Sequence, residues 1–197
     1  MSTSTAPTLA TRLLGTREGT AAIVQNVLLA VIGAAALWLS AKIKVPFYPV
    51  EMTLQVLVVL LIGAAYGWRL GGATVALYLA QGALGLPVFT GTPEKGIGIA
   101  YMMGPTGGYL LGFLVMAVMT GWALQRIGTR NVFAIGAVML VADAIMFAFG
   151  LAWLGTLFGW DKPILEWGLY PFILGDLTKV ALAAALTAGI ARFAEKG

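Results

Sequence analysis

The first long apolar run is AAIVQNVLLAVIGAAALWLSA, residues 21–41, and it contains no Asp, Glu, Lys or Arg. An α-helix needs about 20 predominantly apolar residues to cross the hydrocarbon core of a bilayer. Lys42, Lys44 and Pro46 follow the run and end it. The stretch is therefore predicted to be a membrane-spanning helix, and it is too long for the core of a cleavable signal peptide.

The composition of the whole chain supports the same class. Of the 197 residues, 60% are hydrophobic and only 10% are charged, and the mean hydropathy is +0.92. A soluble domain of this size has too little interior to bury so much apolar surface. The sequence is therefore interpreted as a polytopic membrane protein, and nucleic-acid-binding and other soluble classes are excluded.

Further apolar segments extend the pattern to six spans. The five later spans are predicted at residues 53–66, 73–86, 109–124, 132–154 and 170–191. Arg69 and the pair Gly71 and Gly72 are predicted to form the turn between the second and third spans. Residues 89–108 contain six Gly and are predicted to form an ordered loop on the outer face. The predicted fold class is an all-α membrane protein, a compact bundle of six transmembrane helices over residues 21–193, with polar cytoplasmic tails at 1–20 and 194–197.

The distribution of charge predicts the orientation of this bundle. Seven basic residues lie on the segments at the side of the two termini, against four on the opposite side. The seven are Arg12, Arg17, Arg69, Arg126, Arg130, Arg192 and Lys196. Because basic residues concentrate on the cytoplasmic side of membrane proteins, both termini are predicted to be cytoplasmic.

The residues that the chain lacks exclude most enzymatic chemistry. It has no Cys and no His, so it has no thiolate nucleophile, no zinc site of the usual kind and no imidazole base. The nearest approach to a phosphate-binding loop is residues 91–96, and Ile97 stands where the motif needs Lys. The chain is therefore predicted not to be an enzyme, not to hydrolyse ATP by itself and to need no cofactor.

Three ionisable residues lie inside the predicted spans, where a charge is costly unless it has a partner or a cavity. Asp176 and Lys179 are three positions apart and share one helical face. Counted from Tyr170 at the outer boundary, they lie about 9 Å and about 14 Å deep. They form either a self-neutralising ion pair or, as we favour, the polar floor of a ligand site open to the outside. Asp143, at mid-depth, is equally compatible with a proton site and with a hydrogen-bonded structural role.

Small residues recur at every fourth position of the first span, at Ala22, Asn26, Ala30 and Ala34. This spacing leaves a groove into which another helix packs closely. The partner helix belongs either to the same bundle, which composition alone favours, or to a second protein.

Four motifs in order carry a resemblance to a known family. They read VEMTLQ at residues 50–55, GALGLPVF at 82–89, GPTGGY at 104–109 and PFILGDLTK at 171–179. With these motifs the chain resembles the BioY family, the biotin-binding membrane subunits (S components) of energy-coupling factor (ECF) transporters. Glu51 departs from the pattern, because relatives usually carry Pro before the T-x-Q segment.

The resemblance implies a site for biotin near the outer surface, beneath the loop between the third and fourth helices. Asp176 and Lys179 match the D-x-x-K of the last helix, whose members contact biotin, and residues 91–108 match the binding loop. Thr92 and Thr106 stand where some relatives carry a ligand-contacting Asn and Arg. Lys95, Lys179 and backbone N–H groups remain alternatives for binding the valerate carboxylate. The residues expected to contact biotin are Asp176, Lys179, Thr92, Thr106, Gly91, Gly107 and Tyr170.

The resemblance also implies the partners. An S component of this type docks on a transmembrane coupling subunit through small residues of its first helix, here Ala30 and Ala34, and separate ATP-binding cassette ATPase subunits supply the energy. We therefore expect a high-affinity biotin-binding subunit of an uptake transporter in the inner membrane of a prokaryote. The alternative is a solitary ion-coupled biotin or vitamin carrier with Asp143 as its proton site.

Overall fold

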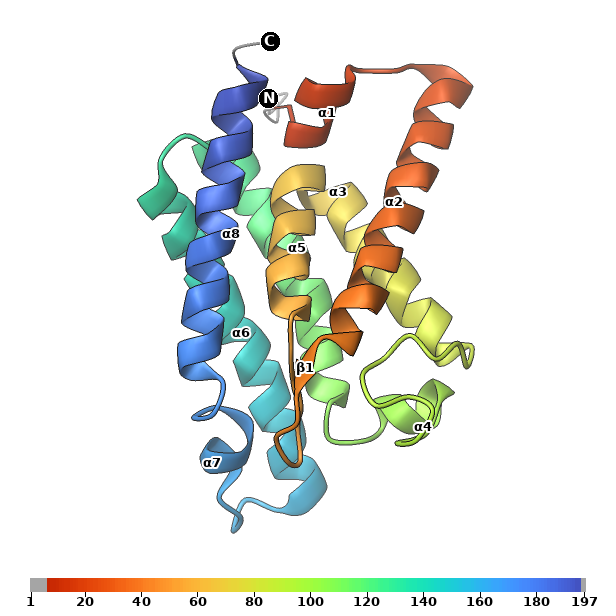
Figure 1. The fold of residues 1–197 in the computed structure, drawn as a ribbon, viewed down its shortest axis with the longest axis vertical. Coiled ribbons are helices and arrows are strands. Elements are labelled where there is room, and N and C mark those ends of the chain that lie inside the picture. The colour runs from red at the N-terminus through yellow and green to blue at the C-terminus, as the bar shows by residue number, and fades with distance from the viewer. Residues whose placement is uncertain (1–6, 196–197) are drawn as a thin grey trace, which may run out of the picture.

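The computed structural model describes residues 7–195 as a bundle of long helices with short helices and a small hairpin at its ends (Figure 1). The first six residues of the predicted N-terminal tail and the last two of the C-terminal tail lie outside this range. The elements are α1 (Leu9–Leu14), α2 (Gly19–Lys42), β1 (Lys44–Val45), β2 (Met52–Thr53), α3 (Gln55–Ala83), α4 (Gly98–Met102), α5 (Gly107–Ile127), α6 (Val132–Phe158), α7 (Ile164–Gly168) and α8 (Ile173–Ala194).

Within residues 7–195, five helices are long and apolar enough to cross a membrane. They are α2, α3, α5, α6 and α8. Their outward faces carry large apolar side chains, as a lipid-facing surface requires. On α2, for example, Ile23, Val27 and Ile32 are 65%, 55% and 61% exposed. This pattern supports the prediction of a multi-pass membrane protein.

The count of six separate spans is not confirmed, because the second and third predicted spans both lie in α3. This helix is interrupted at Gly67, which has φ 74° and ψ 179°. Figure 1 shows the amber first half rising toward the end of the molecule that holds both termini, and the yellow second half running back down. The turn is thus at Gly67 and not at Arg69 to Gly72. Gly67 takes it because a positive φ is unfavourable for any residue with a Cβ.

The N-terminal segment contains more structure than a polar tail. Thr8 caps α1, and its Oγ1 accepts a hydrogen bond from the backbone N–H of Thr11 at 3.2 Å. Leu9 and Ala10 are buried where α1 packs against α3 and α8. Burial of these two apolar side chains explains why this part of the tail is helical.

Glycine residues bring α3 and α5 into close contact. A Cβ on Gly63 would lie 2.6 Å from the carbonyl oxygen of Ala117, and one on Gly121 would overlap backbone atoms of Gly67 and Trp68. Helices in lipid associate largely through such close van der Waals contact between small residues. The contact fixes α5, and with it the aromatic residues near its start, against the first half of α3.

We predict that Gly121→Ala destabilises the protein by about 1–3 kcal/mol, because overpacking a tight contact has costs of this size. The measurement is the Tm of the purified protein in detergent, with about 2–4 °C expected per kcal/mol. Gly189→Ala is the matched control, because nothing lies within 4 Å of a Cβ at Gly189 in α8. An equal loss of Tm in both variants would contradict the close-contact explanation.

Candidate ligand-binding site

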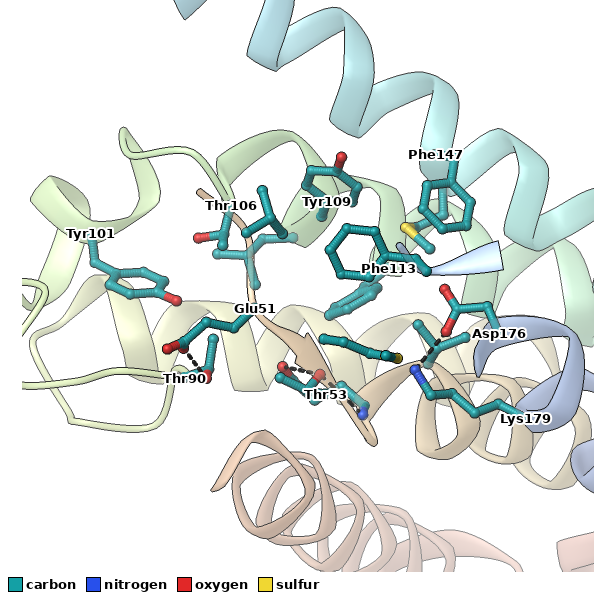
Figure 2. A pocket seen from close by; sticks show the side chains of 17 residues that line it. Glu51, Thr53, Thr90, Tyr101, Thr106, Tyr109, Phe113, Phe147, Asp176 and Lys179 are labelled. Atoms are coloured by element: carbon teal, nitrogen blue, oxygen red, sulfur yellow. Dashed lines mark hydrogen bonds and ion pairs between the residues drawn. The ribbon is translucent and has the colours of Figure 1, made fainter. Parts of the chain in front are cut away.

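The candidate site is a small cavity at the end of the bundle opposite the termini (Figure 2). It contains about 50 Å³ of space that a water-sized sphere can occupy, which is room for only a few water molecules. Loop segments, the first turns of α3, α5 and α8, and the middle of α6 contribute its walls. The lining residues are Val50, Glu51, Met52, Thr53, Gln55, Val56, Thr90, Tyr101, Thr106, Tyr109, Leu110, Phe113, Met146, Phe147, Phe172, Asp176 and Lys179.

Asp176 and Lys179 form a buried ion pair at one side of this cavity. Lys179 Nζ donates to Asp176 Oδ1 at 2.5 Å, and the two side chains are 12% and 4% exposed, respectively. The spacing of three residues on α8 places both on the same face. A carboxylate accepts N–H donors and an ammonium donates to carbonyl or anionic oxygens, so the pair offers a ligand both kinds of partner.

Glu51 is the centre of a second polar cluster on the other side of the cavity. Its carboxylate accepts hydrogen bonds from Lys44 Nζ at 3.0 Å and Thr90 Oγ1 at 2.7 Å, and Lys95 Nζ lies 2.9 Å from Oε1. Burial raises the pKa of Glu51, but hydrogen bonds from Lys95, Thr90 and Lys44 outweigh that effect and lower it to about 2. Glu51 is therefore ionised at neutral pH and joins the hairpin to the loop before α4.

The strand pairing explains how Glu51 reaches this position. Strands β1 and β2 are antiparallel, with Lys44 opposite Thr53 and Val45 opposite Met52. The hairpin therefore folds the residues before α3 back over the end of the bundle. Because Glu51 directly precedes β2, this register places its carboxylate beside Lys44.

Aromatic side chains supply most of the remaining wall. Phe172 packs edge-on against Phe47, with ring centroids 5.8 Å apart, and lies 6.3 Å from Phe147. Tyr109 Oη donates to the carbonyl oxygen of Gly168 at 2.7 Å, so its hydroxyl is satisfied by the protein. Burial raises the pKa of Tyr101, on the short helix α4, to about 12. These rings offer apolar surface to a ligand between the two charged clusters.

The T-x-Q segment, residues 53–55, begins a chain of hydrogen bonds that stabilises one wall of the cavity. Thr53 Oγ1 donates to Gln55 Oε1 at 3.2 Å, and Gln55 Nε2 donates to Tyr78 Oη at 2.8 Å. Tyr78 in turn donates to the carbonyl oxygen of Val88 at 3.1 Å. This chain of hydrogen bonds joins the two halves of α3 to the loop that follows it.

Three of the predicted contact residues line the cavity, namely Asp176, Lys179 and Thr106. The other four are Thr92, Gly91, Gly107 and Tyr170, and they are not among the lining residues. Thr92 Oγ1 instead bonds within the loop, donating to the carbonyl oxygen of Phe89 at 2.6 Å and accepting from Lys42 Nζ at 3.2 Å. Tyr170 is 57% exposed.

The backbone conformation explains why glycine stands at Gly91 and Gly107. Gly91 has φ 68°, a conformation that glycine adopts without strain. A Cβ on Gly107 would overlap the carbonyl oxygen of Met102. Both residues therefore shape the loop above the cavity, because each allows a turn or a close approach that a larger residue would block.

Three other residues singled out in the sequence are not among those that line this cavity. Ala34 is 1% exposed, and therefore packs within the bundle. Ala30 is half-buried and closer to the surface of α2. Asp143 is 7% exposed, and its Oδ1 has no hydrogen-bond partner in the part of the chain that the structure describes.

The sequence did not predict that Glu51, Thr90, Tyr101 and Tyr109 line the cavity. The available signal for Glu51 was a carboxylate in an apolar entry segment, seven residues after Lys44. Its partners Thr90 and Lys95 come from a distant loop, so only the folded chain brings the cluster together.

Comparison with known proteins places this arrangement in a family. The sequence profile of the BioY family matches residues 16–196. The chain belongs to the BioY family.

Its relatives are named as transporters. The biotin transporter BioY of Rhodobacter capsulatus is 38% identical over 179 residues, which cover 82% of this chain and 92% of that protein. The biotin transporter BioY of Thermotoga maritima is 35% identical over 156 residues, covering 79% and 89%. The crystal structure of the S-component for biotin from an ECF-type ABC transporter matches with a TM-score of 0.76 and 25% identity, covering 92% of this chain and 96% of that one. The family is one of transporters and not of enzymes, as the missing Cys and His predicted.

The Glu51 cluster yields a prediction about pH. Because the folded-state pKa of about 2 lies below the ordinary value, the ionised carboxylate stabilises the fold above about pH 4.5, and this contribution is lost as the pH falls toward 2. We expect Glu51→Gln to lower Tm at pH 7 by about 3–6 °C, since a hydrogen bond to a charged group contributes about 1.5 kcal/mol. The variant should also lose less Tm than the wild type between pH 4.5 and 2.

Glu94→Gln is the control for this measurement. Glu94 is exposed on the loop that holds Thr90 and Lys95, and it has no ion pair among the described residues. Tm curves that are the same for Glu51→Gln and Glu94→Gln would contradict the stabilising role of Glu51.

Proposed function

We propose that the chain is the high-affinity biotin-binding membrane subunit of an ECF-type uptake transporter. The observation that carries the proposal is the buried pair Asp176 and Lys179 facing an aromatic wall in a small cavity, within a fold whose relatives are named for biotin. Biotin offers a ureido carbonyl, two N–H donors, an apolar thioether ring and a carboxylate on an alkyl chain. A carboxylate, a cation and an apolar wall are the partners that such a ligand needs.

In this proposal the ureido N–H groups donate to Asp176, and the bicyclic ring packs among Phe113, Phe147 and Phe172. Lys179 or Lys95 binds the valerate carboxylate, with backbone N–H groups of the loop as a further source of donors. The ion pair of Lys95 with Glu51 supports this role, because it shows that the half-exposed ammonium group reaches a carboxylate that lines the cavity. Thr92, Gly91 and Gly107 act by shaping the loop, and Tyr170 acts at the outer surface.

We propose six membrane crossings, with the two halves of α3 crossing separately. Residues 55–66 and 68–83 on either side of Gly67 span about 18 Å and about 24 Å as helix. All six arginines lie in α1, in the connections next to it or between α5 and α6, at the turn of α3, or in the last turns of α5 and α8, and these segments lie at the end of the bundle that holds the termini (Figure 1). The positive-inside rule then places both termini in the cytoplasm and the ligand cavity at the outer surface.

The energy for uptake comes from separate subunits in this proposal. The chain has no phosphate-binding loop, so ATP-binding cassette ATPases act through a transmembrane coupling subunit. The exposed side chains of Val27 and Val31 on α2, beside Ala30, form the proposed docking surface. Because Ala34 is 1% exposed, its contribution to docking requires α2 to shift relative to the bundle.

Binding of labelled biotin to the purified protein in detergent tests the site. We expect Asp176→Asn and Lys179→Met each to weaken binding by about 10–100-fold, because a hydrogen bond to a charged group contributes about 1.5–3 kcal/mol. The double variant removes both charges and avoids leaving one buried charge without a partner. Its Tm shows whether the fold is kept.

Asp161→Asn and Lys162→Met are the matched controls. This neighbouring acid and base also form an ion pair at the outer end, at 2.9 Å, but their side chains are 73% and 50% exposed. We expect biotin affinity to stay within about threefold of the wild type in both. Unchanged affinity in the folded Asp176 and Lys179 variants would show that the assigned site is wrong.

One observation favours a second function, that of an ion-coupled carrier working alone. Asp143 is buried, and its Oδ1 has no hydrogen-bond partner within residues 7–195. A buried carboxyl group of this kind is suited to holding a proton in a membrane transporter. In this reading protonation of Asp143 accompanies each transport cycle.

Uptake of labelled biotin in cells separates the two functions. We expect deletion of the ATPase and coupling subunits to abolish concentrative uptake, whereas a protonophore and Asp143→Asn leave uptake in the intact system within about twofold. Uptake that survives the deletion but is abolished by the protonophore and by Asp143→Asn would favour the solitary carrier.

A further inference from the structure

A second and larger cavity lies at the end of the bundle that holds the termini. It contains about 510 Å³ of space that a water-sized sphere can occupy, about ten times the free space of the biotin-site cavity. We call it the arginine cavity, after Arg17, Arg69 and Arg126. Its lining residues are Thr8, Ala10, Thr11, Gly15, Thr16, Arg17, Ala22, Gln25, Asn26, Leu29, Tyr66, Trp68, Arg69, Leu70, Trp122, Gln125 and Arg126.

The fold explains why this space exists. Helix α2 diverges from the bundle toward this end, and the chain between α1 and α2 crosses over the gap (Figure 1). The break at Gly67 places Trp68 and Arg69 at the turn of α3, next to the last turn of α5. Four separate elements therefore meet around the cavity, and three of its walls carry one arginine each.

The charge in the arginine cavity is not balanced by the protein. Its lining contains three arginines and no Asp or Glu. Within the described residues, none of the three is within ion-pair distance of a carboxylate, whereas Arg12 and Arg130 at the same end pair with Glu195 at 3.8 Å and 3.0 Å. Three converging guanidinium groups without a counter-charge form a site for an anion, above all for phosphate oxygens.

Tryptophan side chains hold two of these guanidinium groups. Arg126 Cζ lies 3.9 Å from the ring centroid of Trp122, and Arg69 Cζ lies 4.9 Å from that of Trp68. Trp is enriched at the boundary between hydrocarbon and headgroups, and cation–π contact restrains the arginine. Two of the three arginines are therefore held by residues typical of the headgroup level, where a lipid phosphate lies.

An apolar groove leads from the arginine cavity along the outer face of α2. We call it the α2 groove; its residues are Leu14, Arg17, Thr20, Ala21, Val24, Gln25, Leu28, Leu29 and Ile32. It shares Arg17, Gln25 and Leu29 with the cavity. A cationic pocket joined to an apolar groove matches a molecule with an anionic head and a hydrocarbon chain, which free phosphate lacks.

We propose that the arginine cavity binds the phosphate-bearing headgroup of an anionic membrane phospholipid, whose acyl chain lies in the α2 groove. Basic pockets between transmembrane helices on the cytoplasmic side recognise such headgroups. The lipid fills the space between α2 and the bundle and neutralises the three arginines. This site shares no lining residue with the proposed biotin site, which lies at the opposite end of the bundle.

The test compares two triple variants of the full chain, purified in a neutral detergent. The first, the cavity triple, carries Arg17→Gln, Arg69→Gln and Arg126→Gln and removes all the positive charge from the cavity lining. The second, the control triple, carries Arg12→Gln, Arg130→Gln and Arg192→Gln. It removes three positive charges from the same end of the bundle, but from residues that do not line the cavity. Binding of dioctanoyl phosphatidylglycerol, dioctanoyl phosphatidylcholine and inorganic phosphate is measured by native mass spectrometry and by the shift in Tm.

We expect the cavity triple to bind phosphatidylglycerol about a hundredfold more weakly than the wild type, because each basic residue near a membrane surface contributes about a factor of five. The control triple should stay within about threefold, and phosphatidylcholine should bind weakly to all three proteins. Biotin binding should be unchanged in both triples, which shows that they are folded. If the cavity triple does not fold, Arg126→Gln against Arg130→Gln gives the same comparison one charge at a time.

Two results would overturn the proposal. Equal weakening in both triples would mean that the lipid responds only to the net charge of this end. Inorganic phosphate that binds as tightly as phosphatidylglycerol, with the same dependence on the three arginines, would make the ligand a soluble phosphate and not a lipid.

Discussion

The close contact between α3 and α5 is the constraint on which the rest of the molecule depends. In lipid, burial of apolar side chains gives no net advantage, so helices associate through tight packing and satisfied polar groups. Gly63 and Gly121 allow this packing, and Gly67 lets α3 turn back beside it. The open ends of the two halves are joined by the hydrogen bond between Gln55 and Tyr78 at 2.8 Å. The candidate ligand cavity lies beside the start of α3, near this hydrogen bond. The arginine cavity lies at the turn between the two halves of α3.

The two cavities differ in whether the protein neutralises their charged side chains. In the candidate ligand cavity, each lining carboxylate already has a cationic partner: Asp176 has Lys179, and Glu51 has Lys44 and Lys95. A ligand there must exchange one protein contact for another, which favours a molecule whose own donors and acceptors replace those it displaces. In the arginine cavity the positive charge is left without a counter-charge, so the ligand itself must supply it.

The sequence predicted those features that depend on local pattern. Apolar runs of sufficient length identified the regions of α5, α6 and α8, and the spacing of Asp176 and Lys179 placed them on one face. The turn of α3 was misplaced, because Gly63, Gly67 and Gly71 recur at equal spacing and only the packing against α5 selects Gly67 for the positive φ. Glu51 and Tyr101 were missed as site residues, because their neighbours come from segments about 40 residues away. Such tertiary juxtapositions leave no periodic signal along the chain.

The small free volume of the candidate ligand cavity has a kinetic consequence. With about 50 Å³ available, a ligand much larger than a few water molecules enters only when the residues that line the cavity move apart. The rate of association is then the fraction of open molecules multiplied by the rate of encounter, and it lies below the diffusion limit. The same closure slows escape, so the residence time reports how often the cavity opens. A transport protein benefits from this balance, because a bound molecule stays long enough for a slower transport step to follow.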